Sequence, residues 1–228
     1  FFQQPEVVGG RAEPVIGQFG EAALREAAGH VDMSQVILDE QAGTVYFADP
    51  ELSLDLGAVA KGYTAERVAQ WMLDSDMPSF IISAGGNVRM GNPPADGRTK
   101  WGVGIQDPDG AVLGLSDIVE TLYVTGCSVV TSGDYQRYYV VDGQRYHHLI
   151  DPDTLMPDTD FRSVSIITED SGYADLLSTA AFLMPYEESR AFVDSLDGVE
   201  AIWLFPDGSK KMTFGAMNVA KSCGASNR

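Results

Sequence analysis

The sequence is poor in cysteine and histidine, and this shortage excludes several kinds of site. Its 228 residues include 2 cysteines and 3 histidines. Cys127 and Cys223 lie far apart and form no CxxC pair, so neither a disulfide framework nor a cysteine-ligated zinc site is expected. Cys127 stands in an apolar-leaning run, which favours a buried thiol.

Basic residues are also scarce. The chain has 15 Lys and Arg against 33 Asp and Glu, which gives a formal net charge of −18. Nucleic-acid binding is therefore excluded, since phosphate contacts need clustered cations and the sequence has no such cluster. An anionic substrate would meet a repulsive average field, so its site would need a placed Lys or Arg or a metal ion.

Long apolar runs are missing too. None approaches the length that spans a membrane, and the first residues show no basic region followed by an apolar stretch. Hydrophobic residues make up 44% and charged residues 21%, an ordinary globular composition. The length fits one large domain or two small ones that share a cleft. We expect one domain over 1–228, irregular at 1–17 and frayed at 215–228.

Helical and β-leaning segments are mixed without strict βαβ alternation, which predicts an α+β fold with mixed or antiparallel sheets and packed helices. Helical patterns cover Glu21–Ala28, 58–73, 173–184 and 185–196. The β-leaning runs are 44–48, 80–83, 101–106, 118–125, 138–141, 146–150, 163–168, 200–205 and 210–214. The Asp142-Gly143 pair predicts a tight hairpin that leads into two adjacent histidines.

The histidine pair is the clearest candidate for proton transfer. His147 and His148 are followed by Asp151, and an imidazole near a carboxylate is what proton transfer near neutral pH requires. Histidines beside a turn are also common as surface polar residues. Because side chains alternate along a β run, we expect His148 to face the site and His147 the other face.

A carboxylate and a hydroxyl share one face of the third helical pattern. Asp175 and Thr179 stand one helical turn apart, and such hard oxygen donors suit Mg²⁺ or Ca²⁺. The alternative is a Thr packed in the core and an Asp that the helix dipole favours in the first turn.

Residues 55–62 form a turn that feeds a helix. Helix N-termini attract phosphate, Lys61 adds a cation, and Gly57 and Gly62 would let a ligand approach closely. The spacing does not match a P-loop, and a plain turn with a solvated Lys61 is the alternative. The small-residue turns at 83–87 and 131–135 are unspecific by themselves.

Taken in order, these motifs resemble the ApbE family, the FAD:protein FMN transferases. The resemblance runs from about Val31 to Gly208. The matching motifs are DLGAVAKGY (55–63), SAGGN (83–87), WGVGIQDP (101–108), TSGDY (131–135), HLIDP (148–152) and ADLLST (174–179). Each motif is weak alone, but their shared order is specific.

The resemblance implies a T-fold-related domain that cleaves FAD, releases AMP and attaches FMN through a phosphoester to a Thr or Ser of an acceptor protein. It assigns His148 as general base with Asp151 beside it, and Mg²⁺ to the Ala58 carbonyl, Asp175 and Thr179. The flavin-site positions it implies are Asp55, Lys61, Gly85, Gly86, Asn87, Ser132, Gly133, Leu149 and Ile150.

The resemblance also implies partners and a location. The acceptor would be a redox-complex or flavin-reductase subunit with a Thr/Ser flavinylation motif, and a homodimer is possible for the family. Members are often lipoproteins on the outer face of the cytoplasmic membrane, although this chain shows no anchor cysteine near Phe1. FAD pyrophosphatase activity and non-catalytic flavin binding are the alternatives.

Two departures from the family pattern stand out. Leu155 occupies a position that is usually Gly, so a different turn is expected there. The segment ahead of Asp55 is also shorter than in family members, so part of the N-terminal region is expected to be missing.

Overall fold

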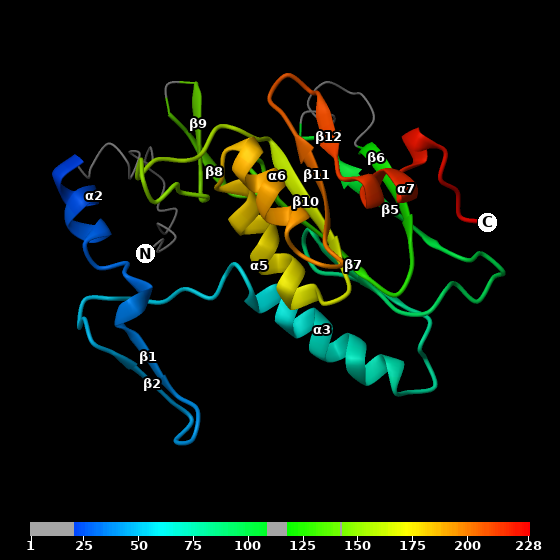
Figure 1. The fold of residues 1–228 in the computed structure, drawn as a ribbon, viewed down its shortest axis with the longest axis horizontal. Helices are drawn as coiled ribbons and strands as arrows, with labels where there is room; N and C mark the ends of the chain where they lie inside the picture. The colour runs from blue at the N-terminus through cyan, green and yellow to red at the C-terminus, as the bar shows by residue number, and fades with distance from the viewer. Residues whose placement is uncertain (1–20, 109–117, 142) are drawn as a thin grey trace, which may run out of the picture.

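A six-stranded antiparallel sheet forms the centre of the protein (Figure 1). The structure is a computed structural model, and it describes residues 21–108, 118–141 and 143–228. The strand order is β12-β11-β10-β7-β4-β3. In chain order, these strands are β3 (Ile81–Ser83), β4 (Asn87–Met90), β7 (Ser128–Gly133), β10 (Ser163–Thr168), β11 (Glu200–Leu204) and β12 (Lys210–Met212).

Helices cover one face of this sheet. The helices are α3 (Ala60–Leu73), α5 (Ser171–Phe182) and α6 (Tyr186–Asp194), and α3 lies alongside α5 in Figure 1. Every residue of the central strand β10 is buried. Val164 and Ile166 pack with Leu177 and Phe182 of α5 in one apolar core, which fixes the position of α5 on the sheet.

A second apolar core fills the opposite face. It lies under strands β5 (Trp101–Gln106) and β6 (Ile118–Val124), helix α7 (Phe214–Val219) and the short 3-10 helix η2 (Lys221–Cys223). Ala216 and Ala220 are fully buried there, so the first part of the tail, expected to fray from residue 215, is instead helical and packed. Its small residues allow close packing against β6.

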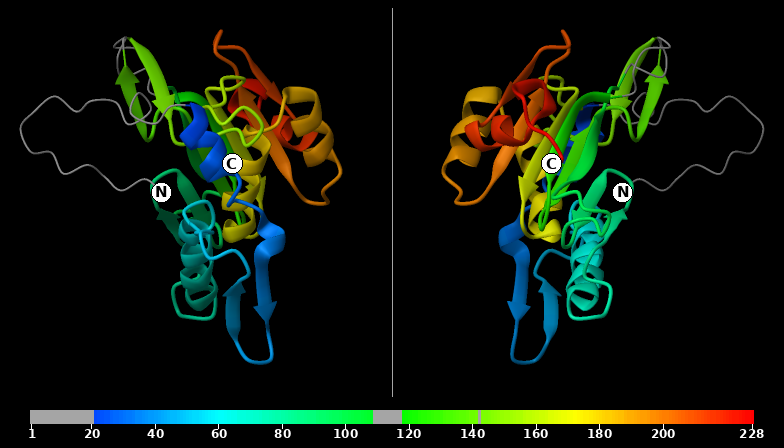
Figure 2. Two further views of the ribbon diagram at one scale, coloured as in Figure 1. Left: turned by 90° about the vertical axis from the view of Figure 1, so that its left-hand side faces the viewer. Right: turned by 90° about the vertical axis from the view of Figure 1, so that its right-hand side faces the viewer.

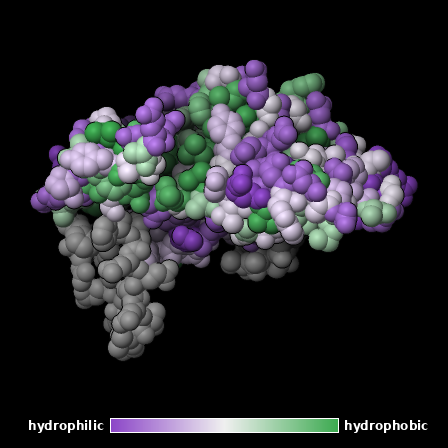
Figure 3. Space-filling model, turned by 90° about the horizontal axis from the view of Figure 1, so that it is seen from below, coloured by the Kyte–Doolittle hydropathy of each residue, from purple (hydrophilic) through white to green (hydrophobic). Residues whose placement is uncertain are grey.

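Two β-hairpins, an α-helix and a 3-10 helix lie outside these layers. They are α2 (Glu21–Ala28), the 3-10 helix η1 (Met33–Gln35), the hairpin β1 (Val36–Asp39) and β2 (Thr44–Phe47), and the hairpin β8 (Tyr138–Val141) and β9 (Gln144–His147). The β1–β2 hairpin projects from the body of the molecule (Figure 2). The face that carries this hairpin and α3 shows hydrophobic surface (Figure 3).

The α+β prediction is confirmed, with differences at element ends. Helix α5 begins before the expected residue 173 because the Asp170 side chain accepts a hydrogen bond from the Tyr173 N–H and caps the helix. Helix α3 begins at Ala60 rather than at residue 58. The expected irregular segment 1–17 lies outside the described residues. Among the helices of the described ranges, none is long and apolar enough to cross a membrane.

Candidate active site

The site is built where α3 and α5 cross, and glycine allows the crossing. A Cβ atom on Gly62 would stand 2.2 Å from the Ser171 carbonyl oxygen and 2.6 Å from the Asp175 Cβ, which is closer than real contacts allow. A Cβ atom on Gly172 of α5 would in turn stand 3.2 Å from the Tyr63 backbone. Gly62 was expected to admit a ligand, but its missing side chain admits α5 instead.

Asp175 belongs to α5, and its side chain contacts the start of α3, so it joins the two helices. Its side chain is buried, and Oδ2 accepts a hydrogen bond from the Gly62 N–H at 2.8 Å. The first N–H groups of a helix have no partner within it, so the carboxylate satisfies one of them at the positive end of the helix dipole. The Lys61 Nζ stands 3.3 Å and 3.4 Å from the two Asp175 oxygens. This brings together two residues that the sequence analysis singled out separately.

Hydroxyl groups surround the next turn of α5. The Thr179 Oγ1 lies 3.2 Å from the Ser132 Oγ of β7, and Ser132 also contacts the Ser178 Oγ at 2.9 Å. Ser178 donates to the Asp175 backbone carbonyl at 3.0 Å. The predicted flavin residue Ser132 therefore holds the predicted metal ligand Thr179 in place.

This donor set fits Mg²⁺. Among the described residues, no group of three or more His, Cys, Asp or Glu side chains could hold a metal ion by itself. Mg²⁺ is usually bound by one or two carboxylates that are completed by water and substrate phosphate, so a lone buried Asp175 beside the Thr179 hydroxyl suits it. The Lys61 distances exceed those of a tight charge-assisted bond, so the carboxylate is open to another cation.

The turn before α3 holds two more predicted residues. The exposed Asp55 accepts a hydrogen bond from the Gly57 N–H at 2.5 Å, so its carboxylate shapes this turn. The Lys61 Nζ lies 3.3 Å from the Gly57 carbonyl oxygen. Ala58 follows in the same turn, half-buried, and its role as a metal ligand stays a prediction.

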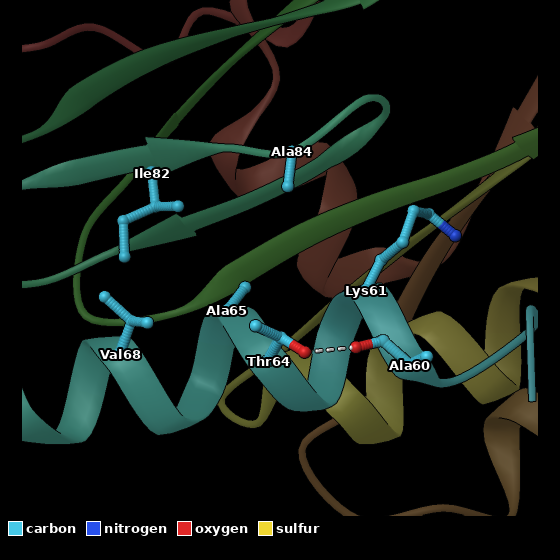
Figure 4. A pocket seen from close by; sticks show the side chains of 7 residues that line it. All are labelled: Ala60, Lys61, Thr64, Ala65, Val68, Ile82 and Ala84. Carbon is cyan, nitrogen blue, oxygen red and sulfur yellow. Dashed lines mark hydrogen bonds between the residues drawn. The ribbon is translucent and has the colours of Figure 1, made fainter.

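A cavity of about 400 Å³ opens beside Lys61 (Figure 4). Its lining is mostly apolar and comes from α3, β3 and the residue after β3: Ala60, Lys61, Thr64, Ala65, Val68, Ile82 and Ala84. The turn between β3 and β4 follows, where Gly85 and Gly86 have φ of 55° and 87°. These left-handed conformations favour glycine, so the predicted flavin residues Gly85 and Gly86 form a tight turn at this rim.

His148 has the chemistry of a base. Its Nδ1 lies 3.2 Å from the Arg137 carbonyl oxygen, which can only accept, so Nδ1 carries the proton and Nε2 has a free lone pair. Desolvation lowers the pKa of His148 and outweighs the hydrogen bond to the Arg137 carbonyl, which raises it, while nearby positive charge lowers it further. The ring is therefore neutral near pH 7.

Asp151 does not pair with His148 as the sequence suggested. Its Oδ1 accepts a hydrogen bond from the Asp153 N–H at 2.8 Å, and this bond lowers the pKa of the carboxyl. The Asp151 carbonyl oxygen accepts the Leu155 N–H at 2.8 Å. Leu155 has φ 58°, so it takes the left-handed conformation that glycine would take, rather than the different turn expected.

His147 is buried away from the site, as expected from alternation along β9. Its Nε2 lies 2.6 Å from the Asp158 carbonyl oxygen, and its Nδ1 accepts from the Leu149 N–H at 3.3 Å. The ring packs edge-on against Phe182. Burial lowers the pKa of His147, which keeps it neutral and structural.

Three predicted flavin residues, Asn87, Gly133 and Leu149, are buried in the protein. Asn87 is fully buried, and its Oδ1 accepts from the Ser171 Oγ at 2.7 Å. Leu149 belongs to the core with Phe161 and Phe182, and Gly133 is packed against the Tyr135 ring. The buried side chains of Asn87 and Leu149 therefore support the site from behind, and the assignment of both residues to the flavin site stays a prediction. Ile150 is half-buried and pairs with Pro157 in a β-bridge.

The sequence analysis missed Glu66, Arg89 and Ser178. Glu66 and Arg89 form a buried ion pair with the Glu66 Oε2 at 2.8 Å from the Arg89 Nε. Glu66 stands one helical turn after Gly62 in the predicted helix, and that spacing was the available signal. A charged side chain on a buried helix face needs a partner, which the sequence alone did not identify.

Residues 9–203 of this chain match the family model described as "ApbE family". The chain belongs to the ApbE family. It is 39% identical over 211 residues to a FAD:protein FMN transferase of Treponema pallidum, covering 86% of this chain and 57% of that protein. A FAD:protein FMN transferase of Klebsiella pneumoniae is 35% identical over 171 residues, covering 75% of this chain and 51% of that protein.

Solved structures of the family share the fold. The ApbE protein of Thermotoga maritima superposes with a TM-score of 0.77 at 34% identity, covering 86% of this chain and 62% of that chain. The apo flavinyl transferase ApbE of Pseudomonas stutzeri gives a TM-score of 0.73 at 24% identity, covering 95% and 64%. This chain thus spans between about half and two thirds of the length of these relatives.

Proposed function

We propose that this chain carries the catalytic part of a Mg²⁺-dependent FAD:protein FMN transferase. The supporting observation is the buried Asp175 carboxylate, which lies between the Gly62 N–H and the Lys61 ammonium, one turn from Thr179. Two ApbE relatives of this chain are named FAD:protein FMN transferase. FAD would be the substrate, and a Thr or Ser of a redox-complex or flavin-reductase subunit would be the acceptor.

Positive charge at the site is the first requirement of this reaction. The chain has a net charge of −18, so a pyrophosphate would be repelled without local cations. Asp175, Thr179 and the Ala58 carbonyl would hold Mg²⁺, which when bound neutralises charge on the pyrophosphate. Lys61 and the positive end of the α3 dipole add positive potential at the same point.

His148 would take the proton from the acceptor hydroxyl at its Nε2. The hydroxyl oxygen then forms a bond to the phosphorus of the FMN half, the bond from that phosphorus to the bridging oxygen breaks, and AMP leaves with the electron pair. A placed base of this kind contributes about 10²–10⁴-fold to the rate. The low pKa of His148 suits this task, because the ring must be neutral to accept a proton.

The cavity beside Lys61 would receive an aromatic ring of FAD. A volume of about 400 Å³ lies within the range of small-molecule sites, and its apolar lining suits a planar ring system. Asp55 shapes the turn before α3, the Gly85-Gly86 turn follows the cavity-lining Ala84, and Ser132 contacts Thr179 of α5. We propose that they limit how the substrate lies against Lys61.

An assay with FAD, Mg²⁺ and a Thr-bearing acceptor domain tests the proposal. We expect flavin fluorescence and the mass of FMN on the acceptor, with AMP released in equal amount. Free FMN and AMP without acceptor labelling would instead identify an FAD pyrophosphatase. Bound FAD that remains intact would identify a non-catalytic flavin-binding protein.

Location and assembly are proposals that depend on the family resemblance alone. We propose an extracytoplasmic site of action, with the protein held at the outer face of the cytoplasmic membrane as a lipoprotein. A homodimer is the proposed assembly. Cell fractionation and light scattering on the full reading frame test the two statements separately.

A further inference from the structure

The Glu66 carboxylate is saturated by donors from three elements. Its Oε2 accepts from the Arg89 Nε at 2.8 Å and from the Ser171 N–H at 2.8 Å. Its Oε1 accepts from the Arg89 NH2 group at 3.2 Å and from the Gln70 Nε2 at 2.6 Å. Arg89 is 2% exposed and also donates to the Met90 carbonyl. This carboxylate therefore ties α3 to β4 and to the first residue of α5.

The contact with Ser171 mirrors the contact at Asp175. Ser171 is the first residue of α5, so its N–H lacks a partner within that helix. Glu66 of α3 accepts this N–H, and Asp175 of α5 accepts the Gly62 N–H of α3. Each helix thus supplies a carboxylate to the N-terminal turn of the other, and we call these two contacts the reciprocal caps.

The spacing of the reciprocal caps couples them. Glu66 stands four residues after Gly62 in α3, and Asp175 stands four residues after Ser171 in α5. The two bonds are therefore one helical turn apart across a crossing of antiparallel helices. The helices cross closely at Gly62, because even a Cβ atom on this residue would stand 2.2 Å from the Ser171 carbonyl oxygen. A shift of one cap must move the other.

Asn87 adds a second tie at the same point. Its Oδ1 accepts from the Ser171 Oγ, and its amide nitrogen lies 3.5 Å from the Ser171 carbonyl oxygen. Asn87 and Arg89 are alternate residues of β4, so one strand holds both Ser171 and Glu66. The start of α5 is fixed to the sheet independently of any ligand.

We propose that Glu66 and Arg89 are positioning residues for the reaction, which set the distance from Lys61 and Gly62 to Asp175 without touching substrate. This inference rests on the proposed function for its activity readout. A positioning role differs from a purely structural one in its effect on Mg²⁺. Loss of this ion pair should change the Mg²⁺ concentration that the reaction needs, whereas loss of a distant ion pair of equal burial should not.

The test compares Glu66→Gln and Arg89→Lys with Glu120→Gln. Glu120 is an ideal control because its side chain is 2% exposed, pairs with Lys210 and accepts from Ser222, yet lies with β6 on the opposite face of the sheet. Arg89→Lys keeps the charge and loses the two-pronged bond, so it serves if Glu66→Gln fails to fold. All measurements are made well below each variant's melting temperature.

Two readouts are used. In Glu66→Gln and Arg89→Lys, amide hydrogen exchange at Gly62 and Ser171 should accelerate relative to amides of β10, because the reciprocal caps loosen together. The Mg²⁺ concentration for half-maximal FMN transfer should rise about tenfold or more. Glu120→Gln should lower the melting temperature while leaving both readouts as in the wild type.

The outcomes separate this inference from the proposed function. Unchanged exchange at Gly62 in Glu66→Gln overturns it, as does an equal change of Mg²⁺ dependence in Glu120→Gln. If the wild-type chain transfers no FMN, the proposed function fails, and the exchange of Gly62 alone decides whether the ion pair positions Asp175.

Discussion

The backbone N–H of Gly62 donates to Oδ2 of Asp175 at 2.8 Å, across 113 residues of sequence. Through this bond, the N-terminus of α3 contacts the buried carboxylate of α5. It also explains why a glycine stands in the first turn of α3: with Cβ atoms absent at Gly62 and Gly172, the two helix backbones approach closely enough for the bond to form.

Replacing Gly62 with Ala should push the helices apart. The new Cβ would meet the Ser171 carbonyl oxygen and the Asp175 Cβ, both of which belong to a rigid helix. We expect the free energy of unfolding to fall by about 1–3 kcal/mol, as measured by urea denaturation. Gly102→Ala is the control, because its Cβ would meet nothing closer than 3.5 Å. Equal effects of the two substitutions would contradict this account.

Asp175→Asn removes the charge of the carboxylate and keeps an oxygen that can accept the Gly62 N–H. We expect Mg²⁺-dependent FMN transfer to fall about 10²-fold or more, because the cation loses its one acidic ligand. The assay follows acceptor labelling across a Mg²⁺ titration. Asp194→Asn, at an exposed carboxylate paired with Arg190, should have no effect. Full activity of Asp175→Asn in stoichiometric Mg²⁺ would show that the metal assignment is wrong.

His148→Gln should lower kcat for FMN transfer by about 10²–10⁴-fold and leave FAD binding nearly unchanged. The pKa of His148 lies below its usual value of 6.5 because of desolvation and nearby cations. The wild-type rate should therefore rise as the pH rises through a pKa below 6.5, since the protonated ring accepts no proton. This acid limb should vanish in the variant. A parallel loss of binding and rate would make His148 a binding residue.

Leu155→Gly should stabilise the protein. A left-handed conformation at φ 58° costs a non-glycine residue about 1–2 kcal/mol, and glycine avoids this cost at the expense of greater freedom in the unfolded chain. We expect a net rise of up to about 1 kcal/mol in the free energy of unfolding. In contrast, Leu176→Gly within α5 should lower it by about 1 kcal/mol. A fall for Leu155→Gly would show that its partly buried side chain matters more than its backbone.

Glu120 should make the protein sensitive to acid. Burial raises the pKa of its carboxyl, but hydrogen bonds from Lys210 and Ser222 outweigh this and bring it to about 2, from 4.5. A lowered pKa in the folded state stabilises the protein above pH 4.5, and this contribution disappears as the pH falls from 4.5 to about 2. Glu120→Gln should be less stable than the wild type by about 3 kcal/mol at pH 7, and the difference should close in acid. A constant difference would exclude this linkage.

The sequence was a good guide wherever a repeat spacing decides the outcome. The helical period placed Asp175 and Thr179 on one face of α5, and the alternation of a β run separated His148 from His147. The predicted hairpin is confirmed by the pairing of Val141 with Gln144, although residue 142 of its turn lies outside the described residues. These features depend on neighbours within a few residues, which a single sequence contains.

Tertiary contacts set the features that the sequence did not predict. The family motifs that contain Asn87 and Leu149 did not reveal that Asn87 accepts a hydrogen bond from Ser171 or that Leu149 belongs to the core. The direction of each side chain depends on its contacts with α5. The pairing of Glu66 with Arg89 spans 23 residues and needs the sheet to bring β4 under α3. The tail was expected to fray because its residues are small and polar. Two of these small residues, Ala216 and Ala220, instead fit closely into the second apolar core.

The β1–β2 hairpin has side chains open to water on both of its faces, including Leu38, Val45 and Tyr46 at 56% to 66% exposure. A two-stranded ribbon has little stability of its own, and this one shares neither apolar core of the sheet. Its local opening should therefore cost far less free energy than global unfolding. In a limited-proteolysis experiment, cleavage should begin between Val36 and Phe47 while the sheet and the reciprocal caps stay intact.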